Sequence, residues 1–166
     1  MSIEGELDRR GLCLPGPLTL PGRTPVPWTW VRIRGNRAYL GGYGPQASDG
    51  SVAGPFGSVG GSVSLDEAQH SARFAAISIL GTLSRSLGDL DRVTAWLMVS
   101  GSINTMPGYT DTPAVMNAFA DLIIELYGHD VGSHARTAIG VTALPFDLPV
   151  IVACEVEIDR TGADGS

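Results

Sequence analysis

The stretch SLDEAQHSARFAAISILGTLSRSLGDLDRVTAWLMVS, residues 64–100, joins a helical pattern to a strand pattern and decides the fold class. It opens with the capping box Ser64-Leu65-Asp66-Glu67, whose serine and glutamate side chains bond free N–H groups at a helix start. Gly88 ends the helical pattern. Residues 92–100 are apolar on both faces of a strand, which predicts an interior strand. The helical apolar positions are Ala68, Ala72, Ala75, Ala76, Ile79, Leu83 and Leu87.

Outside this stretch, the sequence predicts a second helix and four more strands. Pro113 suits the first helical position and Gly128 ends the pattern. A hairpin is expected over residues 28–34 and 37–41, with Gly35-Asn36 as its turn. Residues 137–144 and 150–159 form the last pair of strands. The apolar stripe of the helix comprises Val115, Phe119, Leu122, Ile123 and Leu126.

This order of elements predicts an α+β domain with one mixed sheet and both helices on one face. The other face would carry Trp30, Ile151 and Ala153 without cover. Because an uncovered apolar face is unfavourable in water, we expect oligomerisation to bury it.

Three segments are predicted along the chain. Residues 1–27 are rich in Pro, Gly and Leu and form an irregular N-terminal arm that packs on the domain. Residues 28–159 form the domain, and residues 160–166 form a polar tail. Residues 44–62 lack the motifs of a nucleotide-binding loop and predict a long loop or a short edge hairpin. The expected anchors of the arm are Leu12, Leu14, Leu18 and Leu20.

Composition excludes several classes of function. The net charge of −6 opposes general binding to nucleic acid, which depends on neutralising phosphates. Every basic side chain except histidine is Arg, which removes Schiff-base chemistry, a pyridoxal-phosphate anchor and a P-loop lysine. Anion recognition would therefore be planar and bidentate.

No targeting signal or transmembrane stretch is recognisable, so we expect a soluble cytoplasmic protein. Cys13 and Cys154 lie far apart and predict two reduced thiols. His70 and His129 have no neighbour at ligand spacing, so no metal site is expected.

Four features occur in a fixed order and together suggest a family. They are Gly35-Asn36-Arg37-Ala38-Tyr39-Leu40-Gly41-Gly42, Gly88-Asp89-Leu90-Asp91-Arg92-Val93, Asn117, and His134-Ala135-Arg136-Thr137-Ala138-Ile139-Gly140-Val141 followed by Leu144-Pro145. In order and spacing they resemble the Rid family, also called YjgF-like or endoribonuclease L-PSP proteins. The resemblance covers roughly residues 10–159 and is closest to the branch with an extended N-terminal arm.

This resemblance implies a chorismate-mutase-like fold and a homotrimer around a central barrel, with ligand clefts between subunits. Active members of the family hydrolyse enamine or imine acids, such as 2-aminoacrylate, to 2-keto acids and ammonia. They need neither a metal nor a cofactor, and none is expected here.

Arg136 is the strongest candidate for ligand binding. Its guanidinium would grip a ligand carboxylate bidentately, or else form an ion pair at a strand end. His134, two residues earlier, is interpreted as a structural hydrogen-bonding group rather than a base. Asn117 either supports the cleft or bonds to nearby backbone.

The other expected ligand contacts depart from the family pattern. Gly41 and Gly42 would bring backbone close to a ligand, beside Tyr43. Gly41 replaces a common serine, and Trp28 stands where many members carry a tyrosine that closes the cleft.

Ile151 occupies the position of the usual catalytic glutamate, so no catalytic residue is assured. Glu155 and Glu157 share its strand parity but would lie about 13 Å and about 20 Å away. Within one subunit neither could replace the missing carboxylate, although a neighbouring subunit could supply an acid.

Three hypotheses follow. The first is a Rid-like protein that binds a small carboxylate in an intersubunit cleft and acts as a deaminase with weak or altered activity. The second, favoured by Ile151, is a non-catalytic ligand sensor or regulatory trimer. The third and weakest is a ribonuclease, because no His/His or His/Lys pair is placed for phosphodiester cleavage.

Overall fold

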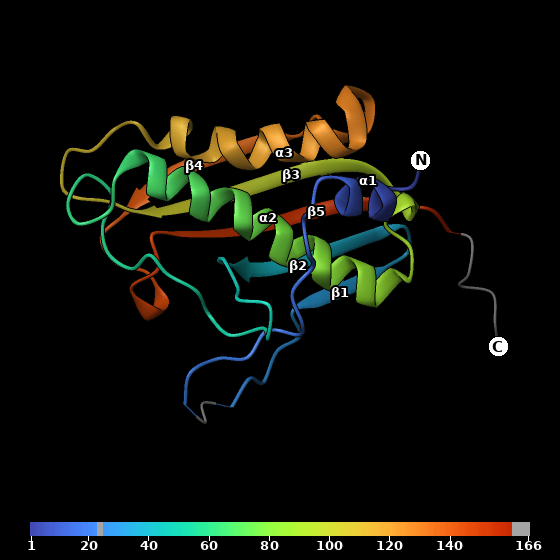
Figure 1. Cartoon of the computed structure of the whole chain (residues 1–166), viewed down its shortest axis with the longest axis horizontal. Coiled ribbons are helices and arrows are strands. Elements are labelled where there is room, and N and C mark those ends of the chain that lie inside the picture. Colours follow the sequence, from blue (N-terminus) through green and yellow to red (C-terminus); the bar gives the residue numbers. More distant parts are fainter. Residues whose placement is uncertain (23–24, 161–166) are drawn as a thin grey trace.

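The computed structural model describes residues 1–22 and 25–160, which form one five-stranded mixed sheet with two long helices on one face (Figure 1). The sheet order is β1-β2-β5-β3-β4, with β3 and β4 parallel and the other pairs antiparallel. The predicted α+β class and the single covered face are confirmed. The strands are β1 Val31–Arg34, β2 Arg37–Tyr43, β3 Val93–Asn104, β4 Ala135–Val141 and β5 Val150–Ile158.

Helix α2, Leu65–Leu87, begins and ends where the sequence predicts. The Ser64 side chain accepts a hydrogen bond from the Glu67 N–H, and the Glu67 side chain bonds back to the backbone of Ser64. Gly88 ends the helix with a φ of 79°, a left-handed conformation that suits glycine. All seven predicted apolar positions are buried against the sheet and α3.

Helix α3, Thr112–Gly132, has Pro113 in its first turn, although it begins at Thr112, one residue earlier than predicted. Its geometry breaks at Gly128, where φ is 75° and ψ is 170°, and a short final turn continues to Gly132. All five residues of the predicted stripe are buried. Two short 3-10 turns, Leu90–Arg92 and Pro145–Asp147, precede β3 and β5.

The hairpin forms with Gly35-Asn36 as its turn, but its strand limits differ from the prediction. β1 begins at Val31 rather than at Trp28, and β2 continues to Tyr43. A bulge between Leu40 and Tyr43 lets β2 continue past Gly41 while its pairing with β5 shifts. β4 likewise lies two to three residues earlier than predicted.

The N-terminal arm contains a helix, so the prediction of a wholly irregular arm is wrong. Helix α1, Ile3–Arg9, is too short to show a period, yet Ser2 caps it by accepting a hydrogen bond from the Gly5 N–H. The described residues of the arm after Arg10 form no further helix, and they pack on the core through Leu12, Leu14 and Leu18, as predicted. The predicted tail beyond residue 160 lies outside the described residues.

The face of the sheet opposite α2 and α3 is uncovered (Figure 1). Ser102 of β3 pairs with Ile139 on one side and with Ile151 on the other, so these three side chains form a row across this open face. Ile139 is 56% exposed. No helix among the described residues is both long and apolar enough to cross a membrane.

Candidate functional site

Arg136 lies on the edge strand β4 and turns toward α3. Its partner in the parallel register is Val99, a core residue, so the two side chains share the helix-covered face of the sheet. The Arg136 Nη1 donates a hydrogen bond of 2.9 Å to Oδ1 of Asn117 on α3. The structure therefore brings together two of the predicted ligand-binding residues, which are nineteen positions apart in the sequence.

Arg136 has no carboxylate partner among residues 1–22 and 25–160. The ion pairs of the described residues involve Arg9, Arg10, Arg37, Arg73 and Arg92 instead. An ion pair at the strand end, the structural interpretation of Arg136, is therefore not formed within the described chain. Arg136 is half-buried as a residue, and its guanidinium, which bonds a neutral amide at an exposed position, keeps donors available for an anion.

His134 occupies a structural position beside Arg136. Its Nδ1 donates to the carbonyl oxygen of Gly132 over 2.8 Å, and its ring meets Phe119 edge-on at 6.3 Å. Burial lowers the pKa of His134, and the positive charge of Arg136 contributes in the same direction. The neutral imidazole fits the predicted hydrogen-bonding role.

A cavity of about 430 Å³ opens on the other side of the sheet, where β2, β3 and β5 meet the arm and the Pro145–Asp147 turn. Ser102 contributes the one side-chain hydroxyl, and no charged side chain of the described residues lines the cavity. The lining residues are Leu18, Leu20, Trp28, Trp30, Gly42, Gly44, Pro45, Val52, Ser102, Leu144, Pro145, Phe146, Leu148 and Ile151.

Three of the predicted ligand contacts line this cavity: Trp28, Gly42 and Ile151. Gly41 and Tyr43 are not among the lining residues. Tyr43 is fully buried in the core, where its ring contacts Trp30 at 5.6 Å and burial raises its pKa. The β2 bulge explains this placement, because it turns Tyr43 to the helix-covered side.

Sequence reasoning missed most of the cavity wall. Leu18 and Leu20 were predicted as packing anchors of the arm, and Phe146 was assigned to a connecting segment. Trp30, at the entry to β1, contacts Trp28 edge-on at 5.8 Å. Its alternation with Val31 was the one signal in the sequence that it lies on the other face of the hairpin.

The cavity and Arg136 belong to different surfaces of the chain. Arg136 is on the helix side of an edge strand, whereas Ser102 and Ile151 line the cavity from the open face. One small ligand cannot touch Arg136 and the cavity of the same chain. Two copies would be needed to bring the two groups together.

The two glutamates nearest to Ile151 on β5 already have partners. The carboxylate of Glu155 accepts a hydrogen bond of 2.6 Å from Arg37, and that of Glu157 accepts one of 2.8 Å from the Thr94 hydroxyl. Neither glutamate lines the cavity. The residues described there supply no group that could act as an acid or base at neutral pH.

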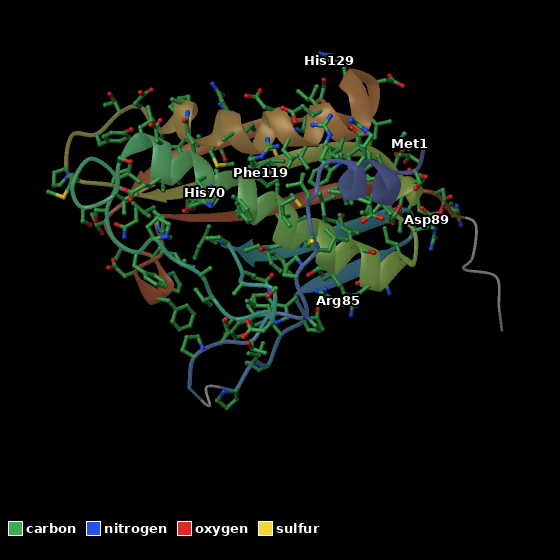
Figure 2. All side chains as sticks on the ribbon, in the orientation of Figure 1. Met1, His70, Arg85, Asp89, Phe119 and His129 are labelled. Carbon is green, nitrogen blue, oxygen red and sulfur yellow. The ribbon has the colours of Figure 1, made fainter. Side chains whose placement is uncertain are left out.

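One group of carboxylates within the described residues has spacing suited to a metal ion: Glu4, Asp89 and Asp91 lie within 4.8 Å of one another. Their oxygens accept backbone hydrogen bonds, from Leu90 to Glu4, from Ile3 to Asp91 and from Asp91 to Asp89. They thereby tie α1 to the start of β3, and we assign them this structural role. His70 on α2 and His129 near the end of α3 lie apart (Figure 2).

Known proteins share both the sequence and the fold of this chain. Protein TCP17 of Trypanosoma cruzi is 32% identical over 158 residues, which cover 95% of each chain. The crystal structure of Atu1372 from Agrobacterium tumefaciens, a protein of unknown function, is 31% identical with a TM-score of 0.83, covering 95% of this chain and 94% of that one. No family model matches the sequence.

More distant structures share the fold. A putative endoribonuclease from Shewanella oneidensis is 22% identical with a TM-score of 0.84, and covers 95% of this chain and 100% of its own. YyfA of Yersinia pestis, described as a member of the conserved Rid protein family, is 15% identical with a TM-score of 0.57, over 81% and 90% of the two chains. The fold is the chorismate-mutase-like α+β fold. The chain therefore belongs to one family with protein TCP17 and Atu1372, and it has the fold of the Rid proteins, as the resemblance implied.

Proposed function

We propose that this protein binds a small carboxylate-bearing molecule in a cleft between two copies of the chain. Arg136 of one copy holds the carboxylate, with Asn117 fixing the guanidinium. The open-face cavity of the neighbouring copy receives the rest of the ligand. A homotrimer closes such clefts symmetrically and covers the open faces.

The observation that carries this proposal is that Arg136 has no acidic partner among the described residues. A half-buried arginine usually has an acidic partner, yet the described residues give it only the neutral Asn117. A bound carboxylate would complete the site with two parallel hydrogen bonds and would neutralise the charge.

Binding is better supported than catalysis. In hydrolysis of an imine acid, water adds to the imine carbon, a proton passes to nitrogen, and ammonia leaves as the carbonyl forms. Each proton transfer needs an acid or a base. Because Ile151 stands at the usual glutamate position, we favour the sensor or regulatory interpretation over efficient deamination of enamine or imine acids.

The first experiment measures pyruvate binding to the purified protein by calorimetry, with sedimentation to define the assembly. Arg136→Ala should abolish binding, whereas Arg34→Ala, which removes an exposed arginine at the hairpin tip, should leave it unchanged. Equal affinity in both variants would contradict the proposal. A generator of 2-aminoacrylate, followed by keto-acid release, separates the two interpretations, because rapid turnover by the wild type would favour the deaminase.

A second experiment tests whether the cleft is shared between copies. Val52→Phe should block the cavity without touching Arg136. When chains carrying Arg136→Ala and chains carrying Val52→Phe are co-expressed in equal amounts and assemble at random as trimers, about a quarter of all clefts combine two intact halves. Binding should reappear at about that level. If both variants bind nothing alone and the mixed assemblies also bind nothing, the shared cleft is wrong.

A further inference from the structure

We infer that the ligand is a 2-oxo or 2-imino acid with a large apolar side chain, most specifically an aromatic ring, and that the open-face cavity selects this group. This inference rests on the proposed function, which supplies the carboxylate contact. In this inference Arg136 binds the carboxylate, and the cavity determines which carboxylic acids bind most tightly.

The size of the cavity argues against a three-carbon ligand. Its volume of about 430 Å³ falls in the range of sites that enclose drug-sized molecules. A three-carbon acid whose carboxylate is held at the rim would leave most of this apolar volume to water. A phenyl or indole ring would displace that water and gain the free energy of apolar burial.

The chemistry of the lining points to the same class. Two indole rings and one phenyl ring stand in the wall, together with branched aliphatic side chains. Offset or edge-on contacts between aromatic rings add to simple burial. Ser102 provides one hydroxyl, and the described lining has no charge to pair with a basic or acidic side chain, so charged ligand side chains would be excluded.

The Pro145–Asp147 turn supplies independent evidence for a preformed wall. Phe146 and Asp147 have φ values of 58° and 56°, a left-handed conformation that is uncommon for bulky residues such as Phe. Backbone in this conformation occurs preferentially at ligand sites, where the surrounding structure enforces it. Here it presents Phe146, 41% exposed, to the cavity.

Asn104, which is buried at the end of β3, holds this turn. Its Nδ2 lies 3.3 Å from Oδ1 of Asp147, and the carbonyl of Asp147 accepts a 2.7 Å hydrogen bond from the Gly57 N–H. Elsewhere in the wall, Trp28 packs edge-on against Trp30, which in turn contacts the buried ring of Tyr43. The turn that carries Phe146 and the two indole rings thus already have contacts within the chain in the absence of a ligand.

The experiment compares pyruvate with phenylpyruvate by calorimetry on the full-length protein. The wild type should bind phenylpyruvate at least about tenfold more tightly, because the ring is buried. Trp28→Ala removes half-exposed wall, so the fold should persist, and it should weaken phenylpyruvate binding severalfold more than pyruvate binding. Phe56→Ala, an equally exposed aromatic outside the cavity, is the matched control and should change neither affinity.

The outcomes separate this inference from the proposed function. If pyruvate binds through Arg136 but phenylpyruvate binds no more tightly, the aromatic selection is wrong and the carboxylate site stands. If the preference for phenylpyruvate persists in Arg136→Ala while pyruvate binding is unaffected, the cavity is an apolar site and the carboxylate role of Arg136 fails. If neither acid binds, both are overturned.

Discussion

The backbone at Gly42 lies so close to Ile151 that no side chain fits at position 42 while Ile151 keeps its place. A Cβ added at Gly42 would lie 2.6 Å from Cγ2 of Ile151, closer than real Cβ contacts allow. A Cβ added at the adjacent Gly41 meets nothing within 4 Å. The glycine at position 42 thus makes room for the branched side chain of Ile151.

Gly42→Ala should therefore destabilise the protein by about 1–3 kcal/mol through overpacking, whereas Gly41→Ala should be nearly neutral. Because Ile151 is stiff at its branched carbon, it cannot easily move aside. Adding Ile151→Ala to Gly42→Ala should recover part of the loss. Denaturant unfolding of the wild type, Gly42→Ala, Ile151→Ala and the double variant measures this coupling. Strict additivity of the two free-energy changes would contradict the contact.

Asn117→Asp offers a nearly isosteric test of the carboxylate site. The new carboxylate would lie where Oδ1 of Asn117 now accepts a 2.9 Å hydrogen bond from Arg136, and would pair with the guanidinium. We expect unchanged or higher thermal stability together with at least tenfold weaker pyruvate binding, because the anion site becomes occupied from within. Asn117→Ala, which only removes the positioning bond, should weaken binding less. If Asn117→Asp is stable and binds pyruvate with wild-type affinity, Arg136 does not bind the carboxylate.

The attachment of the arm should depend on pH through Glu6. Hydrogen bonds from Arg9 and Arg10 lower the pKa of Glu6 from 4.5 to about 2. Arg10 also bonds Glu125 of α3 over 2.7 Å, so the cluster links α1 to the domain. A lowered folded-state pKa means that the stabilisation is complete above about pH 4.5 and disappears as the pH falls toward 2.

We therefore expect the difference in melting temperature between the wild type and Glu6→Gln to be largest near neutral pH and to shrink between about pH 5 and about pH 2. Thermal unfolding followed across this range checks the sign. A difference that stays constant, or one that grows on acidification, would show that Glu6 does not act through its charge.

The two thiols should differ sharply in reactivity. Cys13 is exposed, whereas Cys154 is buried in the core and burial raises the pKa of its thiol. Because the thiolate is the reactive form, a disulfide reagent at about pH 8 should modify Cys13 within minutes and leave Cys154 intact until the protein unfolds. Cys13→Ser should abolish the fast phase, and two fast equivalents in the wild type would contradict the buried position of Cys154.

Much of the fold could be predicted from local signals, because the capping box at Ser64, the proline at 113 and the glycine at 88 each act through neighbouring backbone. The apolar faces of α2 and α3 could also be predicted, since apolar residues recur at helical spacing in the sequence. Helix α1 escaped prediction because seven residues are too few to show a helical period. The ion pair that attaches it to the domain, from Arg10 to Glu125, depends on α3 and cannot be read from the local sequence.

The candidate site was predictable to a smaller extent. Arg136 and Asn117 were identified through the family resemblance, and the hydrogen bond between them is a tertiary fact. The β2 bulge, which turns Tyr43 into the core, cannot be recognised from the alternation of apolar and polar residues along the strand. The positive φ values of Phe146 and Asp147 are also invisible in a sequence where neither position is glycine.

The N-terminal arm forms one wall of the cavity from outside the sheet, through Leu18 and Leu20. Substitutions there can reshape the cavity while the hydrogen-bonded ladder and the helix interface stay as they are. Selection for a new ligand could thus act on the arm with less effect on the sheet and its helices than substitutions at Gly42 or Ile151 would have. The arm is the segment in which we expect relatives with different ligands to diverge first, and it is a natural place to begin redesigning ligand preference.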